Sequence, residues 1–197
     1  MKSFRYKLQK WIITSPIGEV QIFKRPFWFI FGGSTSYKIK GEEQRKIINN
    51  LKVGDLVFKQ WDKYISGKFI PGFWPHVGVY IGRNKVIHAD VQRGVVSDDI
   101  LTYLRCDSAA VLRCTKEFDK KEIVSRAKSL LGKEYDYAFD FNDDIFQCCT
   151  ELVNYTYGNV EGIHFERKKD GFFSKDTIPP DNVYENEAFE VIIDIRP

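Results

Sequence analysis

One cysteine and two histidines in this sequence have the residue types and the spacing that nucleophilic catalysis needs. Cys149 lies near the start of residues 147–155, which are predicted to form a helix, and a helix N-terminus stabilises a thiolate through its dipole and unpaired N–H groups. His76 and His88 lie far upstream, and an imidazole can take a thiol proton when a further group orients the ring. These residues indicate an enzyme with a cysteine nucleophile.

Both histidines fall in residues 76–89, where the alternation of apolar residues predicts a β-hairpin. The odd positions are apolar, and the other parity is shared by His76, Gly78, Tyr80, His88 and Asp90. If the apolar side faces the core on both strands, the two histidines emerge on one common face. We therefore expect the His76 ring to lie about 3–4 Å from the Cys149 sulfur. Its other ring nitrogen should face His88 or, failing that, Asp90.

The two adjacent cysteines must be told apart. Successive helical residues diverge by roughly 100°, so only one of Cys148 and Cys149 can face the histidine strand. We assign Cys149 as the nucleophile and expect its pKa to be depressed, with His76 as general base and His88 as the residue that orients His76. Cys148 should be packed in the core, with an ordinary or raised pKa.

Three further residues are candidates for substrate binding: Tyr80, Tyr135 and Glu151. Core packing is the alternative for each tyrosine, and a structural function is the alternative for Glu151. A metal site has little support, because Cys106 and Cys114 are eight residues apart and no C-x-x-C pair occurs. We expect neither a metal nor another cofactor.

Composition limits the class of protein. With 197 residues, of which 43% are hydrophobic and 29% charged, one globular domain is expected and disorder is not. The 30 basic and 27 acidic residues give a net charge of +3, which is too small to predict nucleic-acid binding. Four cysteines do not form a disulfide-rich pattern, so we expect a cytoplasmic protein.

The most apolar stretch lies near the N-terminus. Residues 26–31, with three phenylalanines and one tryptophan, are far fewer than the roughly 20 needed to span a bilayer, so no transmembrane segment is predicted. A buried strand or a partner surface is expected there, with peripheral membrane contact as the alternative. Residues 11–13 are too short an apolar run for a signal peptide.

The remaining patterns predict an order of mixed helices and strands. Residues 1–40 are expected to form a strand-rich extension packed on the core, and residues 41–197 a catalytic domain, as one structural unit overall. Helices are predicted at 41–51, 118–131 and 147–155, with Gly132 capping the second. Strands are predicted to begin at 53–58 and to cover 109–114 and 187–195, with a loop and short helix at 97–104. This order indicates an α+β fold.

Residues 76–89, 132–137 and 149–153 together resemble the circularly permuted papain-like cysteine hydrolases of the NlpC superfamily, in particular its YaeF/YiiX-type permuted amidases. The resemblance runs from about residue 53 to 191 and includes 178–184. It implies a permuted papain-like (NlpC-type) fold, in which an antiparallel sheet packs against helices that include the one bearing the nucleophile. It also implies cleavage of an amide, in a small peptide or an amino-acid amide, through a thioester on Cys149.

The sequence departs from that branch at its third catalytic position. His88 stands where the branch commonly has an acidic residue, and the pair of histidines resembles the lecithin retinol acyltransferase-like relatives. With the Phe- and Trp-rich N-terminal segment, this motivates a second hypothesis, a lipid-directed acyl hydrolase or acyltransferase acting on a lipid-like substrate. A non-catalytic binding module on the same fold is the third, although an intact Cys149 and both histidines argue against it.

Overall fold

The computed structural model describes residues 7, 10–11, 20–22, 29–31, 37–62, 70, 72–139, 141, 145–169 and 176–196. Near the N-terminus, β1 (Val20–Ile22) and β2 (Phe29–Phe31) pair antiparallel as a separate two-stranded sheet. Residues 12–13 and 26–28 of the predicted apolar runs lie outside the described residues, as does most of the predicted N-terminal extension. The packing of that extension on the core therefore stays a prediction.

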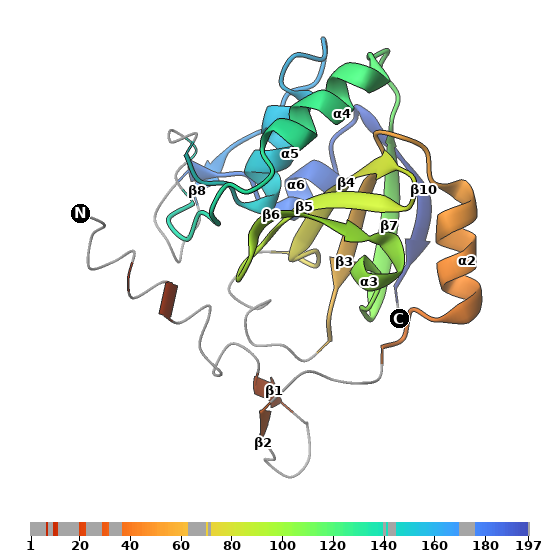
Figure 1. The fold of residues 1–197 in the computed structure, drawn as a ribbon, viewed down its shortest axis with the longest axis vertical. Helices are drawn as coiled ribbons and strands as arrows, with labels where there is room; N and C mark the ends of the chain where they lie inside the picture. The colour runs from red at the N-terminus through yellow and green to blue at the C-terminus, as the bar shows by residue number, and fades with distance from the viewer. Residues whose placement is uncertain are drawn as a thin grey trace.

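A six-stranded antiparallel sheet forms the centre of the molecule (Figure 1). Its strand order is β10-β7-β3-β4-β5-β6. The strands are β3 (Leu56–Gln60), β4 (His76–Gly82), β5 (Lys85–Asp90), β6 (Gly94–Asp99), β7 (Ser108–Cys114) and β10 (Phe189–Ile195). The predicted hairpin is confirmed, since β4 pairs antiparallel with β5. Figure 1 shows the sheet bending strongly, so that β5 and β6 run across the direction of β7 and β10.

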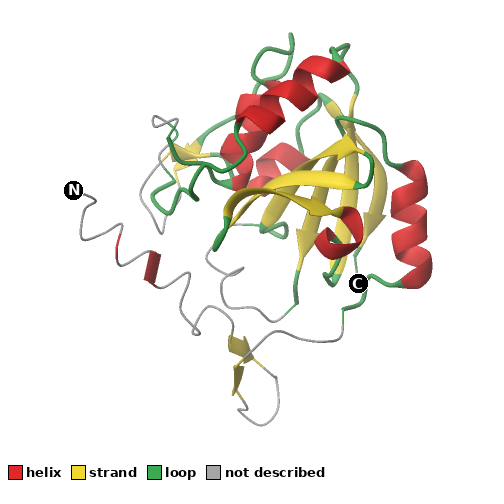
Figure 2. Cartoon of the chain, in the orientation of Figure 1, coloured by secondary structure: helices red, strands yellow, loops and turns green. Residues whose placement is uncertain are grey.

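Helices lie around this sheet (Figure 2). They are α2 (Gly41–Asn50), α3 (Ile100–Tyr103), α4 (Lys120–Ser129), α5 (Cys149–Tyr157) and α6 (Pro180–Tyr184), and the short strands β8 (Lys168–Lys169) and β9 (Asp176–Thr177) pair with each other. Helix α5 packs on β4 and β5 and against α4. The predicted α+β fold is thus confirmed, with the Cys149 helix packed on an antiparallel sheet. No helix in the described ranges is long and apolar enough to cross a membrane.

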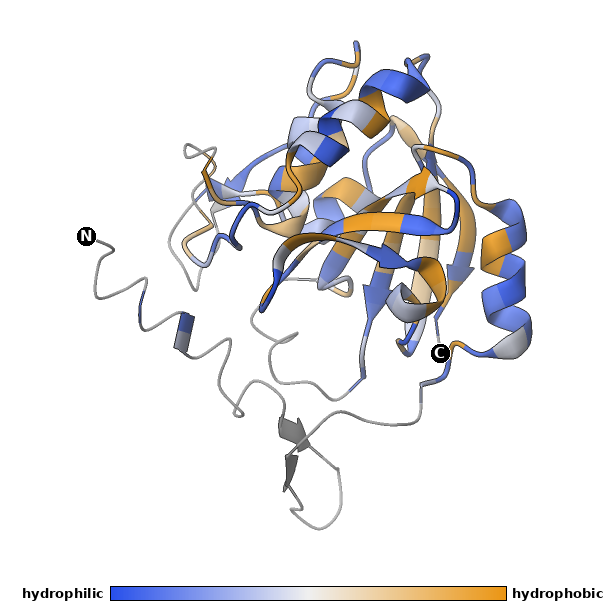
Figure 3. Cartoon of the chain, viewed as in Figure 1, coloured by the Kyte–Doolittle hydropathy of each residue, from blue (hydrophilic) through white to orange (hydrophobic). Residues whose placement is uncertain are grey.

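Two apolar cores lie on the two faces of the sheet, and the odd positions of the hairpin share one of them, as the alternation predicts. Val77, Val79, Ile87 and Ala89 are fully buried in the core beneath α4 and α5. Residues of the other parity, such as Tyr80 and Val86, belong to the core beneath α2 and α3. Figure 3 shows the central strands mostly hydrophobic and α2 mostly hydrophilic, which fits a surface helix whose only fully buried residue is Ile47.

Some elements differ from the predictions. Residues 97–99, predicted as loop, belong to the edge strand β6, where one side faces solvent and polar residues such as Ser97 are tolerated. Helix α4 is shorter than predicted, because Asp119 accepts a hydrogen bond from Lys121 N–H and caps the helix there. Helix α6, which begins at the second residue of a Pro-Pro pair, was not predicted. The predicted strand at 187–195 is confirmed as β10.

Candidate active site

Cys149 is the first residue of α5, and local chemistry fixes the helix start at this position. Glu151 reaches back to accept a hydrogen bond from the backbone N–H of Cys148 at 2.5 Å, which is one half of a capping box. Cys148 is therefore the N-cap and Cys149 lies in the first turn. Backbone N–H groups of Val77, Thr150 and Cys149 itself face the Cys149 sulfur. The sulfur therefore lies beside the residue that follows His76.

The predicted depression of the Cys149 pKa is wrong. The residue is only 5% exposed, and this burial raises the pKa of its thiol to about 11, although the facing N–H groups act in the opposite direction. Burial also raises the pKa of Cys148 well above its ordinary value, and nearby Glu151 adds to that effect. Cys148 is packed in the core as predicted, with its sulfur 3.4 Å from the Thr150 hydroxyl.

The two histidines meet, as the parity of the hairpin predicts. His76 Nε2 lies 3.0 Å from His88 Nδ1, and the two rings are perpendicular. The second nitrogen of His88, Nε2, lies 3.0 Å from a carboxylate oxygen of Asp98 on the neighbouring strand β6. His88 itself is 99% buried, since its relative exposure is 1%. A continuous row of three side chains therefore runs from β4 across β5 to β6.

Asp98, rather than the predicted Asp90, is the acidic end of this row. Arg93 donates to both Asp98 oxygens, at 2.9 and 2.7 Å, and also to Asp90 at 3.1 Å. Hydrogen bonds from Arg93 and His88 lower the pKa of Asp98 far below its usual range. Asp98 lies opposite Val86 in the β5–β6 register, so it is a diagonal neighbour of His88 on the same face. Residues 97–99 resemble a loop in the sequence, so no local pattern indicates Asp98 as the partner of His88.

The ionised carboxylate fixes the position of each ring proton in the row. A carboxylate only accepts hydrogen bonds, so His88 Nε2 must carry a proton and donate it to Asp98. In neutral His88, Nδ1 is then an acceptor, and His76 Nε2 must be the donor toward it. His76 Nδ1 is left with a free lone pair. The His76 nitrogen that could act as a base is therefore Nδ1, not the nitrogen bound to His88.

Both rings are held neutral. Burial is the first cause that lowers the pKa of His76 well below its ordinary value and the pKa of His88 to about 4. The positive charge of Lys59 is the second cause for each, and at His88 it is a larger effect than the hydrogen bond to Asp98, which raises the pKa. Near neutral pH the group therefore consists of a protonated thiol and two neutral imidazoles.

Comparison with known proteins identifies the family to which the chain belongs. Residues 50–190 match the family model of permuted papain-like amidase enzymes, the YaeF/YiiX, C92 family. The chain belongs to this amidase family. Its fold is also similar to the crystal structure of the metalloprotein yiiX from Escherichia coli O157:H7, with a TM-score of 0.64, 19% identity, and a match covering 74% of this chain and 98% of that one. A search of curated proteins found no significant match.

The predicted substrate-binding residues of the amidase fall in different places. The hydroxyl group of buried Tyr135 is close enough to Cys149 for a thiolate there to raise its pKa, after the larger effect of burial. Glu151 is buried at the helix start, where it bonds Cys148 N–H. Tyr80 lies near the hairpin turn, where its hydroxyl accepts from Asn84 N–H at 3.3 Å. Tyr80 is four residues from His76 along β4, about 13 Å away, so it lies apart from the cysteine–histidine group.

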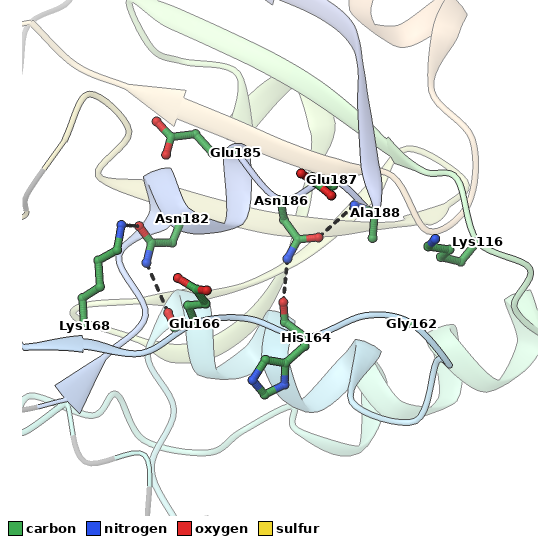
Figure 4. A pocket seen from close by; sticks show the side chains of 10 residues that line it. All are labelled: Lys116, Gly162, His164, Glu166, Lys168, Asn182, Glu185, Asn186, Glu187 and Ala188. Atoms are coloured by element: carbon green, nitrogen blue, oxygen red, sulfur yellow. Dashed lines mark hydrogen bonds between the residues drawn. The ribbon is translucent and has the colours of Figure 1, made fainter.

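A polar pocket of about 500 Å³ lies elsewhere in the amidase (Figure 4). Two asparagines hold its walls together: Asn186 donates to the His164 carbonyl at 2.7 Å, and Asn182 donates to the Glu166 carbonyl at 3.2 Å. Its lining contains none of the cysteine–histidine residues. These asparagines therefore brace the 162–168 segment, and the pocket plays no part in the arrangement around Cys149.

Proposed function

We propose that this amidase is a thiol hydrolase that cleaves the amide bond of a small peptide or an amino-acid amide through a thioester on Cys149. The observation that carries the proposal is the row His76–His88–Asp98, which leaves one His76 nitrogen free beside the strand residue whose N–H faces the sulfur. This combination of nucleophile, base and orienting groups is what acyl transfer requires.

In the first half of the proposed reaction, Cys149 attacks the substrate carbonyl carbon. Because the thiol and the imidazole are both neutral at rest, the proton moves from sulfur to His76 Nδ1 as the S–C bond forms. Backbone N–H groups, including that of Cys149, stabilise the oxyanion. The row toward Asp98 stabilises the His76 imidazolium. The C–N bond then breaks, and the amine leaves with the proton from His76.

In the second half, water hydrolyses the thioester. His76 Nδ1 takes a proton from the attacking water, and the tetrahedral intermediate collapses to release a carboxylic acid and the Cys149 thiolate. The proton on His76 returns to the sulfur. Tyr135, buried near Cys149, is proposed to border the acyl group in this intermediate.

A metal is not part of the proposed mechanism, although the structurally similar yiiX is described as a metalloprotein. Among the described residues, no group of three or more His, Cys, Asp or Glu side chains could hold a metal ion. The nitrogens of His88 are directed at His76 and Asp98, and Nε2 of His76 is directed at His88. The residues therefore do not fit a metal site, and no step is assigned to one.

Mass spectrometry of the intact protein tests the proposal. The protein would be incubated with peptide amides, amino-acid amides and phospholipid vesicles in separate samples, then quenched in acid. We expect the mass of a peptide or amino-acid acyl group on Cys149, its absence in Cys149→Ser, and its retention in the matched control Cys148→Ala. A fatty-acyl mass would instead assign the lipid-directed activity. No adduct from any substrate, with Cys149 inert to iodoacetamide, would contradict a catalytic function.

A further inference from the structure

A buried lysine lies beside the proposed base. Lys59 is on β3, directly opposite His76 of β4 in the antiparallel register. Opposite residues of an antiparallel pair have Cβ atoms about 5 Å apart and point to the same side of the sheet. Lys59 is only 6% exposed, which is rare for a lysine. Its charge is strong enough at this distance to be the second cause that lowers the pKa of both histidines.

The Lys59 ammonium group lies against two aromatic rings, and its strongest charge partner is the Cys106 thiol, whose pKa is raised by burial. The ammonium group lies 4.0 Å from the centre of the Tyr103 ring and 4.7 Å from the Trp61 ring. Within the described ranges, it has no hydrogen bond or ion pair. The nearby carboxylates of Asp90 and Asp98 are held instead by Arg93 and, for Asp98, also by His88.

This arrangement leaves the ammonium group short of acceptors. An ammonium group has three N–H donors, and the faces of aromatic rings do not replace an oxygen acceptor for them. The protein therefore pairs this ammonium group poorly, and an oxygen acceptor on a ligand would stabilise it. The site is also within reach of solvent, because Trp61 and His76 are both only partly buried and their ring centres lie 6.5 Å apart. A ligand that reaches His76 can therefore approach Lys59.

We propose that Lys59 binds a carboxylate of the substrate, which makes the amidase selective for acyl substrates that carry a negative charge close to the scissile amide. Substrates of this class include a peptide with a free C-terminal carboxylate and an amide of an acidic amino acid. The proposal rests on the proposed function, because it places this carboxylate beside the Cys149 and His76 centre. Trp61 and Tyr103 would shield the ion pair from water and thereby strengthen it.

Two small alkylating reagents test the charge preference without a known substrate. Iodoacetate and iodoacetamide react in the same way: an S–CH₂ bond forms to the cysteine sulfur as the C–I bond breaks and iodide leaves. They differ only in that iodoacetate carries a carboxylate where iodoacetamide carries a neutral amide. The second-order rate at Cys149 would be measured at pH 7 by peptide mapping, and each rate divided by that of the same reagent with free glutathione. We expect this normalised ratio to favour iodoacetate.

Variants of Lys59 test whether this residue causes the preference for iodoacetate. Lys59→Met should lower the iodoacetate-to-iodoacetamide ratio roughly tenfold, the size expected for two unit charges about 10 Å apart at an effective dielectric constant of about 20. Lys59→Arg keeps the charge and should keep the preference. Lys85→Met, which removes an exposed charge at the hairpin turn, is the matched control and should behave as wild type. In the wild-type protein the preference should fade between pH 7 and 9, because burial lowers the pKa of Lys59 to about 8.

The outcomes separate this inference from the proposed function. A ratio unchanged by Lys59→Met, or an equal loss of rate with both reagents, would show that Lys59 only supports the structure, and Cys149 would still stand as the nucleophile. A wild-type normalised ratio that shows no preference for iodoacetate at pH 7 would overturn the inference without the need for any variant to fold. Failure of both reagents to modify Cys149 would overturn this inference and the proposed nucleophile together.

Discussion

Exchange of Asp98 for asparagine tests whether the row of hydrogen bonds sets the base. The Asp98 carboxylate can only accept, so it forces a proton onto His88 Nε2. An asparagine amide can donate to His88 Nε2 instead. His88 would then carry its proton on Nδ1 and donate it to His76 Nε2, and His76 would have to carry its own proton on Nδ1. The lone pair on His76 Nδ1, which the proposed mechanism uses as the base, would then be lost.

The magnitude follows from the distances in the row. Two contacts of 3.0 Å, one on each side of the His88 ring, place the Asp98 charge about 8 Å from the nearer edge of the His76 ring. At an effective dielectric constant of about 20, this charge stabilises a His76 imidazolium by about 2 kcal/mol, or roughly 30-fold in rate. The wrong tautomer adds to the loss, and in a serine–histidine–aspartate triad the corresponding exchange lowers kcat by about 10⁴. Here the His88 ring separates Asp98 from the base, so we expect Asp98→Asn to lower the rate by about 10²- to 10³-fold.

The assay is the rate of Cys149 alkylation by iodoacetamide at pH 7, because the thiol must lose its proton to react. Asp99→Asn is the matched control, since Asp99 is adjacent but caps α3 by accepting from Leu101 N–H at 3.0 Å, a function that asparagine also performs. Thermal unfolding would show that both variants are folded. If Asp98→Asn reacts at the wild-type rate, the tautomer argument is refuted.

Three further predictions concern stability. Gly94→Ala should lower the free energy of unfolding by about 3 kcal/mol, because φ is +72° and a Cβ atom would lie 2.2 Å from the Lys133 carbonyl oxygen. Gly132→Ala, at φ +84° but in open space, should lower it by about 1 kcal/mol. Equal urea midpoints for the two variants would contradict this prediction. Glu151→Ala should unfold about 1 kcal/mol more easily than Glu151→Gln, which keeps an acceptor for the helix start, and calorimetry would show whether the two differ. His88 has a folded pKa of about 4 against about 6.5 when unfolded, so its contribution to stability is present above pH 6.5 and is lost as pH falls toward 4. Urea unfolding at pH 7 and pH 5 should therefore show a loss of about 2 kcal/mol from this group, which His88→Asn would remove.

The elements that carry the site could be read from local sequence patterns. The alternation in residues 76–89 predicted a hairpin with both histidines on one face, and β4 and β5 place them there, with 3.0 Å between their nitrogens. A strand's side-chain period of two is a local property, so it can be read without knowledge of the partner strands. The helix was predicted at 147–155 and begins at Cys149, where Glu151 supplies a cap three residues after the N-cap, which is also a local signal.

The chemical state of the site depended on tertiary structure. Asp98 becomes the partner of His88 through the β5–β6 register, and Lys59 becomes the neighbour of His76 through the β3–β4 register. Strand register depends on contacts between segments far apart in the chain, which a local pattern does not encode. The sign of the Cys149 pKa shift was missed for the same reason: a helix N-terminus lowers a thiol pKa, but here the packing of α5 on β4 buries the sulfur, and burial is the larger effect.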